Sequence, residues 1–509
     1  MTSPRLAALA TLLVGAVLRI YELTLRPFHH DEGVNGFFMM RLMNEGVYKY
    51  DPSNYHGPSL YYFTLPLVKM LGLQSYALRL EPVIFGMGLL LLALCLGRRM
   101  GAWAAVAAAA FLAVSPGMVF ISRYFIHEMM LLFFTLGLVV ATDLYGERKT
   151  TVWLMAAVAC AALMVATKET SAPTLVVLAI AWAMAWGWMV MAGAGRASDP
   201  EAGPKKKGKK PSKTEAASSG GDRSDAGAPH RDLTTVIWAL VLFIGINALL
   251  YTSFHTNPEG AMDALRAFAF WSKTGESAHV HPFTQYLEWM ARQELGVLVL
   301  GTVGIVFALA RRPNTLTVFC AFWTLGVFSM YSLIKYKTPW LTVNIVLPAA
   351  IMSGFAVQEL ARVLGRSVGV IVCVAFLSLG LVQATRLNFV HYDDNQDEYV
   401  YPYAHTVRDI RRLLHDVDTL AARANEPDPR ILIVTSNYWP LPWYMKDHKG
   451  AQFFGKMTVL SDARLVIAES TQQNEVLAGS SGRLQPIGNY PLRPGVTLVL
   501  WAQPELGKP

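Results

Sequence analysis

Eleven apolar segments, each close to the length of a membrane-spanning helix, constrain the fold of this chain more than any other feature. A helix of about 20 apolar residues crosses the hydrocarbon core of a bilayer. Of the 509 residues, 53% are hydrophobic and only 16% are charged, which excludes an ordinary soluble protein. The sequence therefore predicts an all-α polytopic bundle, with spans near 4–24, 78–97, 102–120, 124–145, 151–168, 171–191, 233–254, 294–310, 315–334, 341–361 and 367–386.

Basic residues between these segments predict the orientation of the bundle. An odd number of spans puts the termini on opposite sides of the membrane, and the basic clusters all fall on the side of the N-terminus. The positive-inside rule makes that side the cytoplasmic side of a plasma (inner) membrane. The clusters are Arg98 with Arg99, Arg148 with Lys149, the run at 204–213, Arg311 with Arg312, and Arg362 with Arg366. The run at 204–213 is more typical of a cytoplasmic anchoring loop than of a nucleic-acid site.

Changes in composition divide the chain into four parts. Residues 1–191 form an N-terminal membrane half, whose first external loop spans 25–77, and residues 233–386 form a second membrane half. Between them, residues 192–232 are rich in Gly, Pro, Ser, Ala and Lys and predict a disordered cytoplasmic linker. Residues 387–509 predict a small external α/β domain, because their short apolar runs are bounded by turn residues. Its strands are expected at 431–436, 463–470 and 495–502, and a helix at 408–424.

The first external loop carries the residues that most strongly suggest chemistry. Asp31 and Glu32 are adjacent, with His29 and His30 before them and His56 after them. Apolar residues at helical spacing follow the acid pair, so we expect an amphipathic helix on the membrane surface that ends at Gly46. Carboxylates beside a membrane helix are expensive to desolvate, which favours a functional role. A solvated acidic loop is the alternative interpretation.

Five cations lie at the external ends of spans, against the positive-inside rule. Any one of them is explained by a long side chain that reaches the lipid headgroups. Together they indicate a cationic site for an anion in the membrane, such as a lipid phosphate, because ammonium and guanidinium groups bind phosphate oxygens strongly. These cations are Arg79, Arg123, Lys168, Lys335 and Lys337.

A second acidic residue, Glu128, begins the fourth span close to Arg123 and His127. It either neutralises Arg123 or takes part in a site. A carboxylate pair beside a lipid-phosphate site suggests glycosyl transfer: cations hold the phosphate as it leaves the sugar, and one carboxylate accepts the proton of the attacking hydroxyl. We expect Asp31 to be that base, and Glu32 or Glu128 to orient the acceptor or a metal ion.

Several motifs resemble those of known glycosyltransferases. HHDE (29–32), YHGPSLYY (55–62) and RLEP (79–82) resemble the dolichyl-phosphate-mannose protein mannosyltransferases and the bacterial aminoarabinose transferases of the GT-C superfamily. RYFIHE, KET, YKTPWL and NYWPLPWY are similar to a flippase-associated branch found with archaeal N-glycosylation genes. The chain departs from the mannosyltransferases in having Gly57 before Pro58 and in lacking their central repeat domain, which leaves the acceptor open.

The resemblance implies a GT-C-like fold of about eleven spans and an inverting hexosyl- or pentosyltransferase. The donor would be a polyprenyl-phosphate sugar, and the acceptor a lipid, glycan or protein at the external, periplasmic face, within a membrane whose lipids the chain contacts. It also implies that Asp31 is catalytic, and that His56, Arg123, Glu128 and Lys337 are active-site positions.

Other side chains of the loop have two interpretations each. His30, His56, Tyr55 and Tyr61 are candidates for binding the acceptor or the sugar, although tyrosines at an interface more often form an aromatic belt. We expect no required cofactor. A divalent metal is an alternative for which His29 and His56 are weak candidate ligands, since no tight ligand spacing is present.

A non-enzymatic flippase, transporter or accessory protein for lipid-linked saccharides is the alternative function. Such a protein needs polar residues through the thickness of the membrane, whereas the charges here lie at its external rim. Internal repeats, which are common in transporters, are not evident in the sequence. The sequence therefore favours an enzyme.

Overall fold

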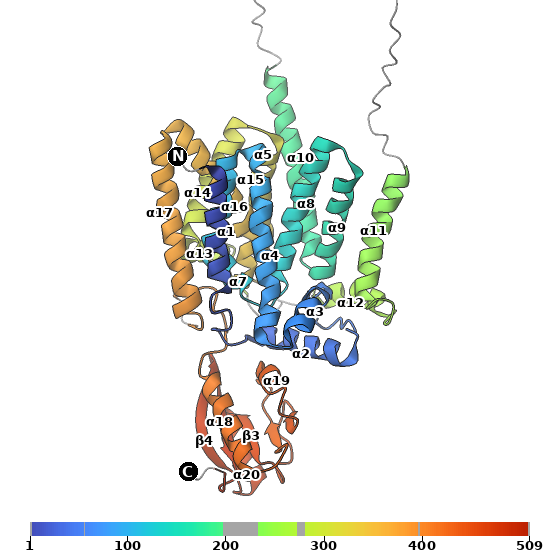
Figure 1. The fold of residues 1–509 in the computed structure, drawn as a ribbon, viewed down its shortest axis with the longest axis vertical. Coiled ribbons are helices and arrows are strands. Elements are labelled where there is room, and N and C mark those ends of the chain that lie inside the picture. The colour runs from blue at the N-terminus through green and yellow to red at the C-terminus, as the bar shows by residue number, and fades with distance from the viewer. Residues whose placement is uncertain (1–2, 55, 197–232, 272–279, 395–397, 507–509) are drawn as a thin grey trace, which may run out of the picture.

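The computed structural model describes residues 3–54, 56–196, 233–271, 280–394 and 398–506. Tyr55 and most of the expected linker at 192–232 lie outside these residues. The described chain is a helical bundle with a small sheet domain at one end, as Figure 1 shows. This arrangement confirms the expected fold class.

Each of the eleven expected spans overlaps a helix of the bundle. Seven described helices are long and apolar enough to cross a membrane alone, and nine spans result if each of two bent helix pairs counts as one. The bends are 64° between α6 and α7 and 114° between α13 and α14. The bundle helices are α1 (Pro4–Ile20), α4 (Ser75–Cys95), α6 (Ala102–Val114), α7 (Pro116–Ser122), α8 (Glu128–Arg148), α9 (Thr151–Thr167), α10 (Ser171–Arg196), α11 (Leu233–Tyr251), α14 (Leu295–Arg311), α15 (Thr315–Leu333), α16 (Val343–Val363) and α17 (Arg366–Thr385).

Burial separates the inner helices from the outer ones. In α16, 89% of the apolar window is buried, whereas none of that window is buried in α11. Large apolar side chains such as Leu233, Trp238 and Ile244 therefore remain exposed along α11. Contiguous apolar surface of this extent is typical of a helix that faces lipid. The chain is a multi-pass membrane protein.

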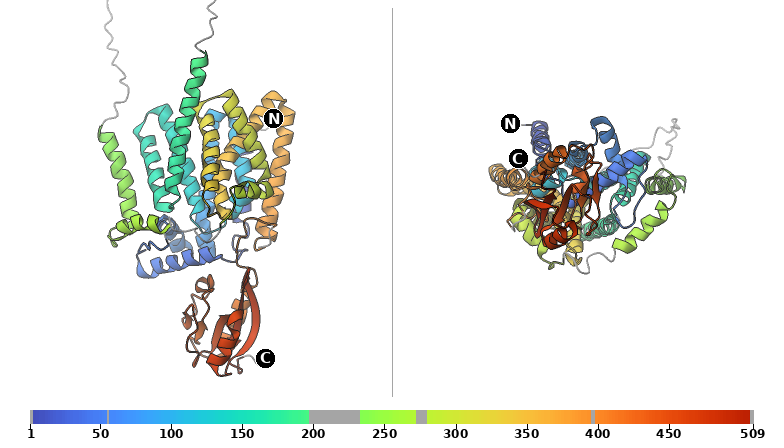
Figure 2. Two further views of the ribbon diagram at one scale, coloured as in Figure 1. Left: turned by 180° about the vertical axis from the view of Figure 1, so that it is seen from behind. Right: turned by 90° about the horizontal axis from the view of Figure 1, so that it is seen from below.

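Short helices lie at the end of the bundle that faces the sheet domain, and the four-residue α5 lies at the opposite end (Figures 1 and 2). The helix expected after the acid pair is α2, which ends as predicted at Gly46, whose φ of 74° suits a residue without a side chain. The short helices are α2 (His30–Glu45), α3 (Ser59–Leu71), α5 (Gly97–Met100), α12 (Gly260–Trp271) and α13 (Gln285–Gln293).

The C-terminal domain contains a five-stranded sheet in the order β2-β1-β3-β5-β4, with β1 parallel to β2 and β3 and the remaining pairs antiparallel. The three expected strands are β1, β3 and β5, and the expected helix is α18. Strand β4 was not expected, because two prolines and a glycine interrupt it, and it forms an edge with irregular register. The elements are α18 (Ile410–Arg423), β1 (Ile431–Ile433), α19 (Leu441–Tyr444), β2 (Ala451–Phe453), β3 (Leu465–Glu469), α20 (Gln473–Ser480), β4 (Gln485–Arg493) and β5 (Val496–Ala502).

The domain packs on α2 through the segment that contains α19. A Cβ atom at Gly33 would lie 2.6 Å from Cβ of Pro440, and one at Gly36 would lie 2.7 Å from Cε3 of Trp443. The Trp443 ring also stacks on Phe28, with 5.1 Å between the ring centroids. Gly33 and Gly36 lie one turn apart on the same face of α2. We call this face the glycine seat; it fixes the domain against the helix that carries Asp31.

Candidate active site

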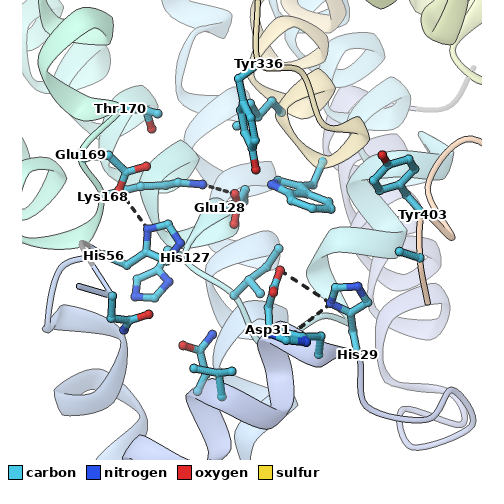
Figure 3. Close-up of a pocket in the computed structure, with 18 of the residues that line it drawn as sticks. His29, Asp31, His56, His127, Glu128, Lys168, Glu169, Thr170, Tyr336 and Tyr403 are labelled. Carbon is cyan, nitrogen blue, oxygen red and sulfur yellow. Dashed lines mark hydrogen bonds and ion pairs between the residues drawn. The ribbon is translucent and has the colours of Figure 1, made fainter. Parts of the chain in front are cut away.

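A cavity of about 840 Å³ lies between the bundle and the C-terminal domain. Its walls come from α2, the start of α8, the connection between α9 and α10, the segment after α15, and two segments of the C-terminal part (Figure 3). Its lining includes these residues: His30, Asp31, Asn35, His56, Glu128, Lys168, Glu169, Tyr336, Trp340, Tyr403 and Arg493.

Asp31 lines this cavity as the second residue of α2. Its side chain is 41% exposed, and its Oδ2 lies 3.4 Å from the hydroxyl of Tyr124, which also contacts Nδ1 of His29. Burial opposes ionisation of Asp31, but positive charge nearby brings the pKa of its carboxyl below the usual value: His29 and His30, which are protonated only in the acid range where Asp31 titrates, and also His56 and Lys168. Asp31 is therefore a carboxylate at neutral pH, open to the cavity.

His29 caps α2 and does not neutralise Asp31. Its Nδ1 accepts a hydrogen bond from the backbone N–H of Asp31 at 3.1 Å, so this nitrogen carries no proton. Burial lowers the pKa of His29 to about 4, which keeps the imidazole neutral near pH 7. The ring fixes the start of α2 and leaves the negative charge of Asp31 available.

Glu32 does not line the cavity. Its carboxylate is fully buried and forms a bidentate pair with Arg79, with both N–O distances at 2.7 Å. It also accepts hydrogen bonds from the backbone N–H groups of Phe125 at 3.0 Å and His29 at 3.1 Å. With its oxygens so engaged, Glu32 has no exposed atom with which to orient an acceptor, contrary to our expectation.

Glu128 lines the cavity, but its partner is not the one expected. Its carboxylate forms a buried ion pair with Lys168, which lies at the end of α9 (Figure 3). Arg123 lies elsewhere: its guanidinium donates to backbone carbonyls of residues 18–22. The local spacing in the sequence suggested Arg123, but the packing of α8 against α9 brings Lys168 to Glu128 instead.

A second pair joins His56 to Glu169, with Nδ1 and Oε2 2.9 Å apart. Glu169 belongs to the KET motif, and its place in the sequence predicted no role for it. Next to His56, the backbone N–H of Gly57 donates to the carbonyl of Thr167 at 3.0 Å. A proline in place of Gly57 has no N–H for this bond, which explains the departure from the Pro-Pro pattern.

Of the five cations expected to form a phosphate site, only Lys168 lines the cavity. Arg79 forms an ion pair with Glu32, and Arg123 donates hydrogen bonds to the carbonyls at the end of α1. Lys337 is buried and donates to the carbonyls of His281 and Ile334, so it holds the segment after α15 in place. Lys335 is exposed and lies outside the cavity wall.

The remaining candidate residues also divide into those that line the cavity and those that do not. His30 lines the cavity, whereas Tyr61 is buried behind it and donates to Oδ1 of Asn35 at 2.9 Å. Sequence reasoning assigned no role to several residues of the cavity wall: Asn35, Tyr336, Trp340, Tyr403 and Arg493. Tyr336 and Trp340 belong to the YKTPWL motif, which was a signal for this part of the wall. Tyr403 and Arg493 lie far away in the sequence, and no local pattern indicates them.

Among the described residues, no three side chains of His, Cys, Asp or Glu come together as ligands for a metal ion. The two weak candidates have other partners, because Nδ1 of His29 accepts from the backbone and Nδ1 of His56 contacts Glu169. We therefore assign no residue to a metal.

Comparison with known proteins supports the resemblance seen in the motifs. Residues 56–199 match the family model of the dolichyl-phosphate-mannose-protein mannosyltransferases. No curated protein sequence matches the chain. The crystal structure of ArnT from Cupriavidus metallidurans in the apo state is similar, with a TM-score of 0.67 and 13% identity over 99% of this chain and 98% of that one. The same protein bound to undecaprenyl phosphate gives a TM-score of 0.65 and 14% identity, with the same coverage of both chains.

An oligosaccharyltransferase from Archaeoglobus fulgidus, tethered to an acceptor peptide, is also similar, with a TM-score of 0.52 and 14% identity over 99% of this chain and 76% of that one. Another structure of the Archaeoglobus fulgidus protein contains Zn and sulfate. These likenesses and the partial family match show that the chain has the GT-C glycosyltransferase fold that its motifs resemble.

Proposed function

We propose that this protein is an inverting glycosyltransferase that moves a hexose or pentose from a polyprenyl-phosphate donor to an acceptor hydroxyl at the external face of the membrane. The observation that carries this proposal is the exposed carboxylate of Asp31 in a cavity that also contains the Glu128–Lys168 pair. A general base and a cation for the leaving phosphate are the two groups that such a transfer requires.

The transfer takes place in one displacement. The acceptor oxygen forms a bond to the anomeric carbon while the bond from that carbon to the phosphate oxygen breaks. The electron pair of the broken bond leaves with the polyprenyl phosphate, and Asp31 accepts the proton of the acceptor hydroxyl. No sugar is attached to the enzyme, because the transfer is a single displacement. Since a phosphate is already a good leaving group, no second carboxylate is needed to protonate it.

Lys168 is the residue that we assign to the donor phosphate. Its ammonium group has three N–H donors, and the ion pair with Glu128 leaves others for a ligand. The neighbouring wall includes apolar side chains, such as Ile334 and Leu341, that suit the first isoprene units and the sugar faces. The ArnT structure bound to undecaprenyl phosphate makes a lipid of this class a reasonable ligand for the same fold.

The external position of the cavity rests on the charges of the loops. The cavity, α2 and the C-terminal domain lie at one end of the bundle, and the basic pairs such as Arg98 with Arg99 lie at the other end, at α5 (Figure 1). The positive-inside rule puts α5 in the cytoplasm and the cavity outside. The acceptor, whether lipid, glycan or protein, would therefore be met at the outer surface.

The test is incubation of the purified protein with radiolabelled polyprenyl-phosphate sugars and a membrane extract as the source of acceptor, following release of polyprenyl phosphate. Asp31→Asn is expected to reduce this rate by about 10²- to 10⁴-fold, since it removes the proton acceptor. Donor binding and the unfolding temperature are expected to stay near wild type. Asp447→Asn, on the exposed surface of the C-terminal domain, is the matched control. Turnover of Asp31→Asn within threefold of wild type would exclude the assigned role.

A further inference from the structure

Among the described residues, the wall of the cavity that comes from the C-terminal domain contains one cation, Arg493, at the end of β4. Two contacts fix its guanidinium: it donates to Oδ1 of Asn437 at 2.8 Å and to the carbonyl of Trp439 at 3.2 Å. Asn437 is held in turn by Oε2 of Glu469, to which its side-chain amide donates at 3.0 Å. Arg493 is thus held in one orientation at the cavity wall.

Arg493 differs from the other cation of the cavity in its charge balance. Lys168 is neutralised by Glu128 in a buried pair. Within the described part of the chain, no carboxylate lies at ion-pair distance from Arg493, and its hydrogen-bond acceptors are a neutral amide and a carbonyl. Burial lowers the pKa of Arg493, and the carboxylates of Glu469 and Asp31 oppose this change. Its positive charge therefore lacks a direct counter-ion.

The place of Arg493 indicates which substrate it meets. The donor carries a lipid chain and reaches the cavity from the membrane, on the side of Lys168 and the bundle helices. The C-terminal domain covers the opposite side, where the glycine seat of Gly33 and Gly36 fixes it. A substrate that enters from outside the membrane passes this domain. His30 lines the same part of the cavity, and its ring lies 6.0 Å from that of Trp439, which belongs to the C-terminal domain.

We propose that Arg493 is an acceptor-binding residue, and that the acceptor carries an anionic group, a carboxylate or a phosphate, near the hydroxyl that attacks. This inference rests on the proposed glycosyltransferase function and adds the chemical class of the acceptor. A guanidinium binds such oxygens in a bidentate manner. The two contacts hold the anionic group and also fix the position of the neighbouring hydroxyl. The charge of Asp31 then discourages a wrong pose in which the anion would lie against the base.

The test uses small sugars as probes and the full-length protein in neutral detergent at constant salt. Binding of sodium glucuronate, glucose 6-phosphate and glucose is followed by tryptophan fluorescence, since Trp340 lines the cavity and Trp439 touches Arg493. The wild-type protein is expected to bind the two anionic sugars about 10-fold more tightly than glucose, as a charge-assisted contact implies. Arg493→Gln should abolish this preference, and Arg493→Lys should keep part of it. Arg483→Gln, an exposed arginine of the same domain, is the control and should keep all of it.

Four outcomes would overturn the proposal. The wild-type protein would show no preference for the anionic sugars, or the preference would survive in Arg493→Gln. Alternatively, Arg493→Gln would weaken the binding of all three sugars by the same factor. This result would indicate displacement of the domain and not loss of a charge contact. Affinity for undecaprenyl phosphate, measured in the same detergent, is expected to be unchanged in Arg493→Gln; a loss there would assign Arg493 to the donor. These binding ratios are independent of turnover, so a failure of the glycosyltransferase assay is distinguishable from a failure of this inference.

Discussion

Two regions meet at neighbouring residues of α2: the buried pair of Glu32 with Arg79, and the cavity around Asp31. The two carboxylates differ in their burial and in the number of hydrogen bonds that they accept. Glu32 is completely buried and saturated with hydrogen bonds, whereas the side chain of Asp31 is 41% exposed. The first region ties α2 to the start of α4 and determines where the second one lies. An acid pair in a sequence therefore need not be a catalytic pair: one acid can hold the helix that presents the other.

The structural role of Glu32 is tested most directly by removing its carboxylate. Glu32→Ala leaves Arg79 charged and unpaired in a buried site, and such a loss typically destabilises a protein by about 3–5 kcal/mol. We expect a large fall in the unfolding temperature in detergent. Glu45→Ala, at the other end of α2, removes an exposed pair with Arg41 and is expected to leave the unfolding temperature nearly unchanged, because solvent screens such a pair. Equal unfolding temperatures for the two variants would contradict the structural role of Glu32.

Lys168 and Lys337 permit a second comparison, between a cation that lines the cavity and one that does not. Lys168→Met is expected to weaken donor binding by about 10- to 150-fold, the range for a charge-assisted contact. Lys337→Met should leave donor affinity unchanged and lower the unfolding temperature, because Lys337 holds backbone carbonyls and does not line the cavity. The measurement is binding of a polyprenyl-phosphate sugar in neutral detergent.

Loss of Lys168 also leaves Glu128 unpaired, so the double variant Lys168→Met with Glu128→Gln is needed as a control. It removes both charges, and it should bind the donor as weakly as Lys168→Met alone. If the double variant recovered wild-type affinity, the effect would come from the unpaired carboxylate and not from a lost phosphate contact.

A smaller effect is expected from His29, which lies between the two regions. Burial lowers its pKa to about 4 in the folded protein, against about 6.5 when unfolded. Between these values the unfolded chain binds more protons, so stability rises with pH and is lost as the pH falls. From pH 7 to pH 5 this loss is about 2 kcal/mol.

The measurement is the unfolding temperature at pH 7 and pH 5 for the wild-type protein and for His29→Asn, which keeps an acceptor at the helix start. The wild-type protein should lose more stability on acidification than the variant does. An equal loss in both would show that His29 does not stay neutral in the fold.

Much of the fold could be predicted from sequence because membrane spans and buried strands each have a local signal. The apolar segments located α4, α8 and α16, and short apolar runs located β3 and β5. Strand β2 has only three residues and a partly exposed pattern, so it has no such signal. Strand β4, whose last residue is Arg493, contains prolines and a glycine, so its sequence does not have the pattern of a strand.

The candidate site was predictable only in part, because a sequence shows at which end of a helix a charge lies but not which way its side chain points. Arg79, Arg123 and Lys168 all lie near the end of the bundle that faces the C-terminal domain, yet only Lys168 lines the cavity. Likewise, Glu128 is five residues from Arg123 in sequence and forty from Lys168, and it pairs with the latter. Arg493 could not be found at all, since its place depends on how a separate domain packs.

The glycine seat on α2 has a consequence for the way this protein can change over evolution. Because Pro440 and Trp443 occupy the space that a side chain at position 33 or 36 would need, the two surfaces can vary only together. A chimera that joined the tail of a distant relative to this bundle would carry mismatched shapes, unless α2 were exchanged with it. The helix and the tail therefore form one unit of evolutionary change, although about four hundred residues of chain lie between Gly36 and Pro440.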